Sequence, residues 1–426
     1  MDSSWMQTVR CILRCHQFLS DTGFAAGRST SAMHNIVVDQ PYQFVSPYRG
    51  NLLPRLLGRI LIPRLLRNQY GVSANEVHGA DKIRASIDAG DGILITPNHP
   101  RPCDPMALYP LAHATRSLFF VMASWHLFME GRLQRAIVRL MGAFSIYREG
   151  MDRASLQCAM DILENARRPL VIFPEGAVTR TNDLLNPLME GISTIARGAA
   201  RKRAAGDGGK VVIFPLAIRY HFDGNLTETL EPVLAEIEQR LSWPPQHDLD
   251  LLTRIRKVGG ALLGLKEIQY LGQTQSGDLW ERAEKLIDRL LHPLEEEWLD
   301  GPQSGSVVKR GKNLRSVILK GMVSGDIDDV ERDRRWQQFA ALSLAQQLSL
   351  YPRGYLSPEA AAERFVETVE RFEEDLTGLA RPHPPQRVTM QVCDGIEVPA
   401  EKVRGDDPLM GQVATSLSIA LGLAPE

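Results

Sequence analysis

Between residues 77 and 222, short apolar runs rich in β-branched side chains alternate with stretches of helical periodicity. The runs lie at 93–96, 118–122, 144–147, 170–173 and 211–218, and the helical stretches between them at 105–114, 133–141, 154–166 and 187–203. Strands that alternate with helices are joined by crossovers, which place the strands parallel and the helices on the faces of the sheet. The sequence therefore predicts an α/β fold, a layered core with a mostly parallel sheet flanked by helices.

Polar side chains with catalytic potential follow two of these runs. His99 and Asp104 come just after one run, and Glu175 with Gly176 ends another. A glutamate and a glycine that end a second strand suit a pocket for an anionic substrate. A histidine five positions ahead of an aspartate suits a base and its orienting carboxylate. Alone, this pair is weak evidence, because ten histidines make a chance spacing easy.

Four segments together carry a family resemblance. In chain order they are Asn98-His99-Pro100-Arg101-Pro102-Cys103-Asp104, Gly142-Ala143-Phe144-Ser145-Ile146-Tyr147-Arg148, Phe173-Pro174-Glu175-Gly176 and Val211-Val212-Ile213-Phe214-Pro215-Leu216-Ala217-Ile218. This set resembles the four sequence blocks of the glycerolipid (phospholipid/glycerol) acyltransferases, whose first and third blocks are written NHxxxxD and FPEG. The resemblance covers about residues 70–225 and includes the 1-acyl-glycerol-3-phosphate and glycerol-3-phosphate acyltransferases.

The resemblance implies a role for each matching residue. His99 would be the general base that takes the proton of an alcohol, and Asp104 would orient its ring and stabilise the imidazolium. Arg148, the basic residue of the second block, would bind a phosphate of the acceptor. Glu175 and Gly176 would help to bind the acceptor and to position its hydroxyl.

Several nearby residues need a separate interpretation. The third block of the family commonly continues with Thr-Arg-Ser after its glycine, whereas here the arginine is displaced two places, to Arg180. Arg180 is therefore a substrate-binding candidate without a direct match. Cys103 occupies an unspecified position of the first block, and nothing in the sequence activates its thiol as a nucleophile. Asn98 is expected in a turn, and Asp104 is a candidate N-cap for a helix that starts there.

The implied function is transfer of a fatty acyl group from acyl-CoA or acyl carrier protein to a glycerol-phosphate-type acceptor, lysophosphatidic acid or glycerol-3-phosphate, in phospholipid synthesis. No metal or cofactor is implied, and the acyl thioester is a co-substrate. The displaced arginine leaves open a non-phosphate acceptor, such as an amino-lipid or a sterol-like alcohol. A non-catalytic peripheral lipid-binding protein and an acyl-thioester hydrolase also stay open.

Composition limits the partners and the compartment. The net charge of −2 gives no case for nucleic acid, and five scattered cysteines without metal spacing favour a reducing cytoplasm. No uncharged apolar stretch reaches eighteen residues, so none is expected to span a bilayer. Residues 51–70 alternate leucines with four arginines and no carboxylate, which predicts peripheral contact with an anionic membrane surface. An ordinary core helix with solvated arginines is the alternative, and Pro63 should end or kink the helix.

At 426 residues the chain is long enough for more than one domain. We expect a flexible extension at 1–50, the basic amphipathic segment at 51–75, the acyltransferase α/β domain at 76–230, a helical region at 231–380 and a tail at 381–426. The first 32 residues also resemble a transit-type leader, and Met33 is an alternative start of translation.

In the helical region, Asp278 and Glu281 form a capping pair, and Ser357-Pro358 opens a helix that Gly378 ends. Residues 336–348 suggest a third helix and residues 301–311 a linker. The tail is expected to hold a hairpin at 387–398 and a helix at 408–421. No internal repeat is evident.

Overall fold

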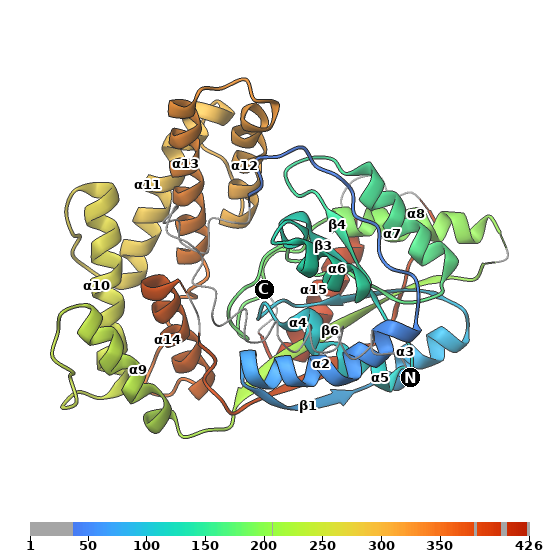
Figure 1. The fold of residues 1–426 in the computed structure, drawn as a ribbon, viewed down its shortest axis with the longest axis horizontal. Helices are drawn as coiled ribbons and strands as arrows, with labels where there is room; N and C mark the ends of the chain where they lie inside the picture. The colour runs from blue at the N-terminus through green and yellow to red at the C-terminus, as the bar shows by residue number, and fades with distance from the viewer. Residues whose placement is uncertain (1–36, 207, 379–380, 402–406, 424–426) are drawn as a thin grey trace, which may run out of the picture.

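The computed structural model describes residues 37–206, 208–378, 381–401 and 407–423. The predictions about a leader and about Met33 fall outside these residues. The described chain forms an α/β part, with the helices α9 to α14 gathered on one side of it (Figure 1).

The α/β part contains one eight-stranded sheet. Its strands are β1 (Val72–His78), β2 (Gly92–Pro97), β3 (Phe120–Ser124), β4 (Ala143–Ile146), β5 (Leu170–Val171), β6 (Val211–Phe222), β7 (Gln386–Val392) and β8 (Ile396–Glu397). The order is β1-β7-β6-β2-β5-β3-β4, with β8 also paired to β6. The pairs from β6 through β4 are parallel, as is β1 with β7, while β7 and β8 run antiparallel to β6. The predicted fold class is confirmed.

Helices cover both faces of this sheet because its central strands are apolar on both sides. The helices of this part are α2 (Leu52–Tyr70), α3 (Ala80–Asp88), α4 (Asp104–Ala107), α5 (Tyr109–Ala114), η2 (Trp125–Phe128), α6 (Arg132–Leu140), α7 (Arg153–Asn165), α8 (Gly191–Ala204) and α15 (Pro408–Leu421). In β2, Ile93 and Ile95 pack with α2 to α5, and Leu94 packs on the other face with α7, α8 and α15. Successive side chains of a strand point to opposite faces, so β2 belongs to two cores.

The predicted hairpin at 387–398 is wrong. β7 and β8 do not pair with each other; both lie along the same edge of β6, with Val392 opposite Leu216 and Ile396 opposite Ile213. Asp394-Gly395 has the composition of a hairpin turn, yet the chain continues in the same direction through a local interruption. Gly395 fits there because a Cβ would lie 2.7 Å from Val212. The tail thus completes the α/β sheet, and its predicted final helix is α15.

The helical part begins directly after β6. Its helices are α9 (Leu226–Arg240), α10 (Leu251–Leu271), α11 (Leu279–Leu299), α12 (Val307–Ser324), α13 (Asp329–Leu348) and α14 (Ala362–Thr377). Asp278 caps α11 as predicted, by accepting hydrogen bonds from the backbone of residues 280 and 281. Ser357-Pro358 does not open α14, which starts at Ala362, and the predicted linker is shorter because α12 already begins at Val307.

An internal repeat, which the sequence did not reveal, joins α9 to α12. At each of three corners, a buried glutamate forms a two-bond ion pair with an arginine 15 or 16 positions later and accepts the backbone N–H of a glutamine 8 positions later. The three sets are Glu238-Gln246-Arg254, Glu267-Gln275-Arg282 and Glu295-Gln303-Arg310. The repeat escapes sequence inspection because only three polar positions per unit recur.

Helix α2 runs without a break from Leu52 to Tyr70, so Pro63 does not end it. Pro63 and the Arg59 carbonyl that loses its helical partner both belong to exposed residues, where water can satisfy that carbonyl. No helix among the described residues is both long and apolar enough to cross a bilayer.

Candidate active site

Two asparagine side chains fix the strand end that carries the first motif. Asn98 follows β2 and exchanges two hydrogen bonds with the backbone of Ile218 on β6, at 2.6 and 3.0 Å. Asn182 binds the backbone of Tyr220 in the same way, at 2.7 and 2.8 Å. Beyond the end of β2, these side-chain amides make the hydrogen bonds to the β6 backbone that a neighbouring strand would otherwise make. Asn98 thereby holds the next residue, His99, at the carboxyl edge of the sheet.

His99 and Asp104 form a direct pair. Nδ1 of His99 lies 2.8 Å from Oδ2 of Asp104, whose side chain is fully buried, while 15% of the histidine side chain is exposed. Asp104 is the first residue of α4 and does not cap it, because its carboxylate is directed to His99. The carboxylate accepts a hydrogen from Nδ1, which leaves Nε2 of the ring as a hydrogen-bond acceptor. That tautomer is the one that a general base needs.

Tyr220 completes the pair and was missed by sequence reasoning. Its hydroxyl donates to Oδ1 of Asp104 at 2.7 Å, and the backbone N–H of Arg101 donates to Oδ2 at 2.9 Å. With His99, three donors surround the aspartate and fix the position of its carboxylate. Burial raises the pKa of Tyr220 well above its usual value, so its phenol keeps the proton that it donates. Tyr220 lies 116 positions after Asp104 in the chain, so only the folded structure reveals this contact.

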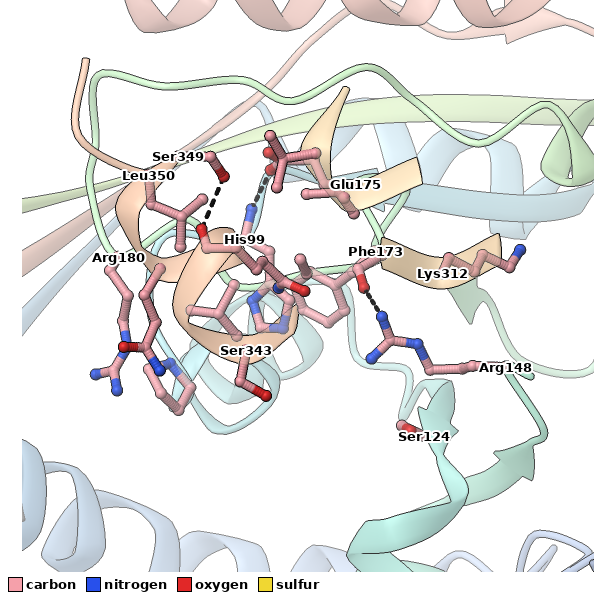
Figure 2. A pocket seen from close by; sticks show the side chains of 18 of the residues that line it. His99, Ser124, Arg148, Phe173, Glu175, Arg180, Lys312, Ser343, Ser349 and Leu350 are labelled. Carbon is pink, nitrogen blue, oxygen red and sulfur yellow. Dashed lines mark hydrogen bonds between the residues drawn. The ribbon is translucent and has the colours of Figure 1, made fainter. Parts of the chain in front are cut away.

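Glu175 links the loop that begins with its own motif (residues 173–182, the second motif loop) to the loop of the first motif (residues 98–104, the first motif loop). Its two oxygens accept the backbone N–H groups of His99 and Asn186, each at 2.8 Å. The side chain is 1% exposed, and burial raises its pKa to about 8. The ring of Phe173, from the same motif, stacks on the imidazole with centroids 4.1 Å apart (Figure 2). Glu175 and Phe173 thus hold the backbone and the ring of His99.

Arg148 and Gly176, predicted from separate blocks, are brought together. The guanidinium of Arg148 donates to the carbonyl of Gly176 (Figure 2). Gly176 adopts a φ of +68°, and a Cβ would lie 2.9 Å from Met189, so the turn requires glycine. Burial lowers the pKa of Arg148. Within the described part of the chain, Arg148 has no carboxylate partner at ion-pair distance.

Arg180 has such a partner. Its guanidinium pairs with Glu374 of α14, so its charge is already balanced inside the protein. The residue lines the same cavity as His99, with a φ of +61°. The displacement of this arginine from the family position therefore coincides with a contact to the helical part.

Helix α14 contacts both motif loops. Glu370 forms a 2.8 Å ion pair with Arg101 of the first loop, and both side chains are largely buried. Arg371 donates to the carbonyls of residues 179 and 180 in the second loop. Close by, the Tyr355 hydroxyl donates to Thr181 at 2.8 Å. Sequence analysis gave no sign of this, because the acidic face of α14 resembles a solvated surface.

A cavity of about 2520 Å³ opens between the two parts. His99, Arg148, Glu175, Gly176 and Arg180 all line it, whereas Asp104 lies behind His99. Most of its wall is apolar, and α2, α6 and the helices α10 to α14 contribute part of it. Such a space suits a long hydrocarbon chain next to the histidine.

Two other chemistries receive no support from this site. Burial raises the pKa of the Cys103 thiol to about 12, and its sulfur lies 3.3 Å from the Tyr220 hydroxyl, so this thiol is held protonated. No group of three His, Cys, Asp or Glu side chains suited to a metal ion occurs among the described residues.

Comparison with known proteins identifies the α/β part. Residues 74–219 match the family model for acyltransferases, and this range contains all four sequence blocks from Asn98 to Ile218. No curated protein is significantly similar to the chain. Residues 74–219 are therefore an acyltransferase domain, which makes the protein an acyltransferase.

Proposed function

We propose that this acyltransferase moves a fatty acyl group from acyl-CoA or acyl carrier protein to the hydroxyl of a glycerol-phosphate-type acceptor, lysophosphatidic acid or glycerol-3-phosphate. The observation that carries the proposal is the His99–Asp104 pair at the wall of a large apolar cavity. A thioester hydrolase would share the catalytic pair, but the partly buried Arg148 beside Gly176 favours an anionic acceptor over water.

The reaction needs one base and no covalent enzyme intermediate. Nε2 of His99 takes the proton of the acceptor hydroxyl while its oxygen attacks the thioester carbonyl. The resulting imidazolium is stabilised by Asp104 through the bond to Nδ1. When the tetrahedral adduct collapses, the C–S bond breaks and the thiolate takes the proton back from Nε2. The products are the ester and the free thiol, and the histidine is neutral again.

Arg148 is the preferred ligand for the acceptor phosphate. It is partly buried and lacks a carboxylate partner among the described residues, whereas Arg180 is already paired with Glu374. A phosphate oxygen can therefore gain a charge-assisted hydrogen bond from Arg148 without breaking an ion pair. We assign Glu175 to positioning of His99 and not to a second base, because both of its oxygens accept backbone hydrogens.

Helix α2 supports peripheral binding to an anionic membrane in the cytoplasm. Leu52, Leu53, Leu56 and Ile60 are exposed on it, and its arginines at 55, 59, 64 and 67 are exposed without an ion pair in the described structure. The same helix lines the cavity through Leu57, Leu61 and Leu65. A membrane-bound α2 would place the cavity next to the source of lipid substrates.

The function is tested by incubating the purified protein with labelled acyl-CoA or acyl carrier protein and a panel of acceptors. We expect acylated lysophosphatidic acid or glycerol-3-phosphate, and little free fatty acid when no acceptor is present. Free fatty acid formed at the same rate without acceptor would identify a hydrolase. Lipid binding without either product would identify a non-catalytic binding protein.

Flotation with anionic vesicles tests the membrane contact. Replacing Arg55, Arg59, Arg64 and Arg67 by Gln should strongly reduce flotation at low salt, because each basic residue near such a surface contributes about 1 kcal/mol. The matched control replaces Arg153, Lys285, Arg289 and Lys320, which are exposed elsewhere, and removes the same charge. Equal flotation of the two variants would reject α2 as the membrane contact.

A further inference from the structure

The cavity wall formed by α12 carries a buried arginine, Arg315. Arg315 is 7% exposed and lines the same cavity as His99 and Arg148. Its hydrogen bond goes to a neutral group, Oε1 of Gln346 on α13, at 3.2 Å. No carboxylate lies within ion-pair distance of Arg315 in the described parts of the chain. Burial, together with the nearby positive charge of Arg148, lowers the pKa of Arg315 to about 10.

The lack of a carboxylate partner distinguishes Arg315 from the arginines of the helical repeat. Arg254 and Arg310 are buried and Arg282 is largely buried, and each forms a two-bond ion pair with a glutamate. Arg310 lies only five positions before Arg315 on the same helix. A buried guanidinium without a counter-charge is costly, and Arg315 is such a group at the cavity wall.

Arg148 and Arg315 are therefore two cations that approach one space from different parts of the protein. Arg148 follows β4, and Arg315 comes from α12. The carboxylate of Glu149 acts on both at a distance, without an ion pair to either. Lys312, one helical turn before Arg315, is exposed and also lines the cavity, as Figure 2 shows together with Arg148. An anion between these groups would supply the missing counter-charge.

We propose that Arg315 of α12, together with Arg148 and with Lys312 at the edge, forms the binding site for the phosphate of the acceptor. This inference rests on the proposed function and extends it, because it gives the helical part a direct role in substrate selection. Two guanidiniums hold a phosphate through charge-assisted hydrogen bonds that a neutral headgroup cannot form. The protein should thus prefer acceptors with a phosphate over neutral monoacylglycerols.

Binding is measured first without any acyl donor, so that the result does not depend on catalysis. Calorimetric titration of the full-length protein with glycerol-3-phosphate should show that Arg315→Gln raises the Kd about tenfold or more. Arg315→Lys, which keeps the charge but loses the planar fork, should lie in between. Lys320→Gln is the matched control, because Lys320 is exposed on α12 away from the cavity. Equal affinity of wild type and Arg315→Gln overturns the proposal.

Kinetics then separate the two sources of phosphate, the acceptor and acyl-CoA. We expect Arg315→Gln to raise the KM for lysophosphatidic acid, to leave the KM for acyl-CoA within about twofold, and to reduce the preference over monoacylglycerol. A raised KM for acyl-CoA alone would assign the arginines to the donor and overturn the acceptor site. Phosphate binding that depends on Arg315, in a protein that acylates no acceptor, would instead refute the proposed function and leave the anion site standing.

Discussion

The α/β part and the helical part contribute to the candidate site in different ways. The α/β part fixes His99 through contacts that its own motifs supply: Asp104 on the ring, Glu175 on the backbone and Phe173 on the ring face. The helical part reaches the motif loops through charged side chains, as in Arg101–Glu370 and Arg180–Glu374. The residues that position His99 therefore lie within the sequence motifs themselves, whereas the shape of the cavity depends on ion pairs between residues far apart in the chain.

The treatment of buried charge also differs between the scaffold and the cavity. In the helical repeat every buried glutamate at a corner has its arginine, and Arg101 and Arg180 are paired in the loops. Arg148 and Arg315, which face the cavity, have no such partner among the described residues. In the described structure, Arg148 and Arg315 thus keep guanidiniums that an anionic substrate can neutralise.

The largest expected effect concerns the His99–Asp104 pair of the α/β part. Asp104→Asn should lower kcat by about 10²–10⁴-fold, because the amide no longer fixes the base tautomer of His99 or stabilises the imidazolium. Circular dichroism and acylation assays of the same preparation check this. An Asp104→Asn variant with near-normal kcat would show that the pair does not act as a unit.

The next effect concerns the contact between the two parts. Glu370→Gln leaves the guanidinium of Arg101 buried without its counter-charge, and should reduce the free energy of unfolding by about 3 kcal/mol. Glu359→Gln is the control, since Glu359 is an exposed carboxylate of the same region. Chemical denaturation measures both. Equal stability of the two variants would mean that this ion pair does not join the parts.

A smaller effect is expected at Tyr220, which hydrogen-bonds to Asp104 of the His99–Asp104 pair. Tyr220→Phe removes one donor to Asp104 and should cost about 1 kcal/mol of stability and lower kcat several-fold, with little change in KM. The separation of kcat from KM distinguishes a residue that positions the aspartate from one that merely fills the core. A pure rise in KM would argue against the positioning role.

The smallest effect is a change in pH dependence. The pKa of Glu175 is raised to about 8 in the folded protein, above its usual value of 4.5. The folded state therefore binds this proton more tightly than the unfolded state, and the stability contributed by Glu175 is full below about pH 4.5 and is lost as the pH rises through 8. Glu175→Gln should flatten the fall in stability between pH 7 and pH 8.5.

Denaturation at these two pH values gives the comparison. Burial raises the pKa of Glu367 to about 7, so the stability that Glu367 contributes is lost at a lower pH than that of Glu175. Glu367→Gln therefore serves as the reference variant. If wild type and Glu175→Gln show the same slope above pH 7, the proton is not held by Glu175 in the folded state.

The sequence predicted those parts of the molecule that depend on local patterns. Alternating strands and helices gave the fold class, and the motif residues His99, Arg148, Glu175, Gly176 and Arg180 all line one cavity. Contacts across long separations escaped prediction: Tyr220 on Asp104, α14 on both loops, and β7 inserted between β1 and β6. The hairpin prediction at Asp394-Gly395 was wrong because hairpin turns and interrupted strands share the same residue composition. Pro63 misled because an exposed helix tolerates a missing hydrogen bond.

The central claim is that Nε2 of His99 removes the proton of an acceptor alcohol. The most direct test measures acylated acceptor formed by wild type and by His99→Ala from labelled acyl-CoA, with saturating lysophosphatidic acid and with folding verified by thermal melting. We expect product formation to fall by about 10²–10⁴-fold in the variant while acceptor binding persists. Product formed at the wild-type rate by a folded His99→Ala protein would contradict it.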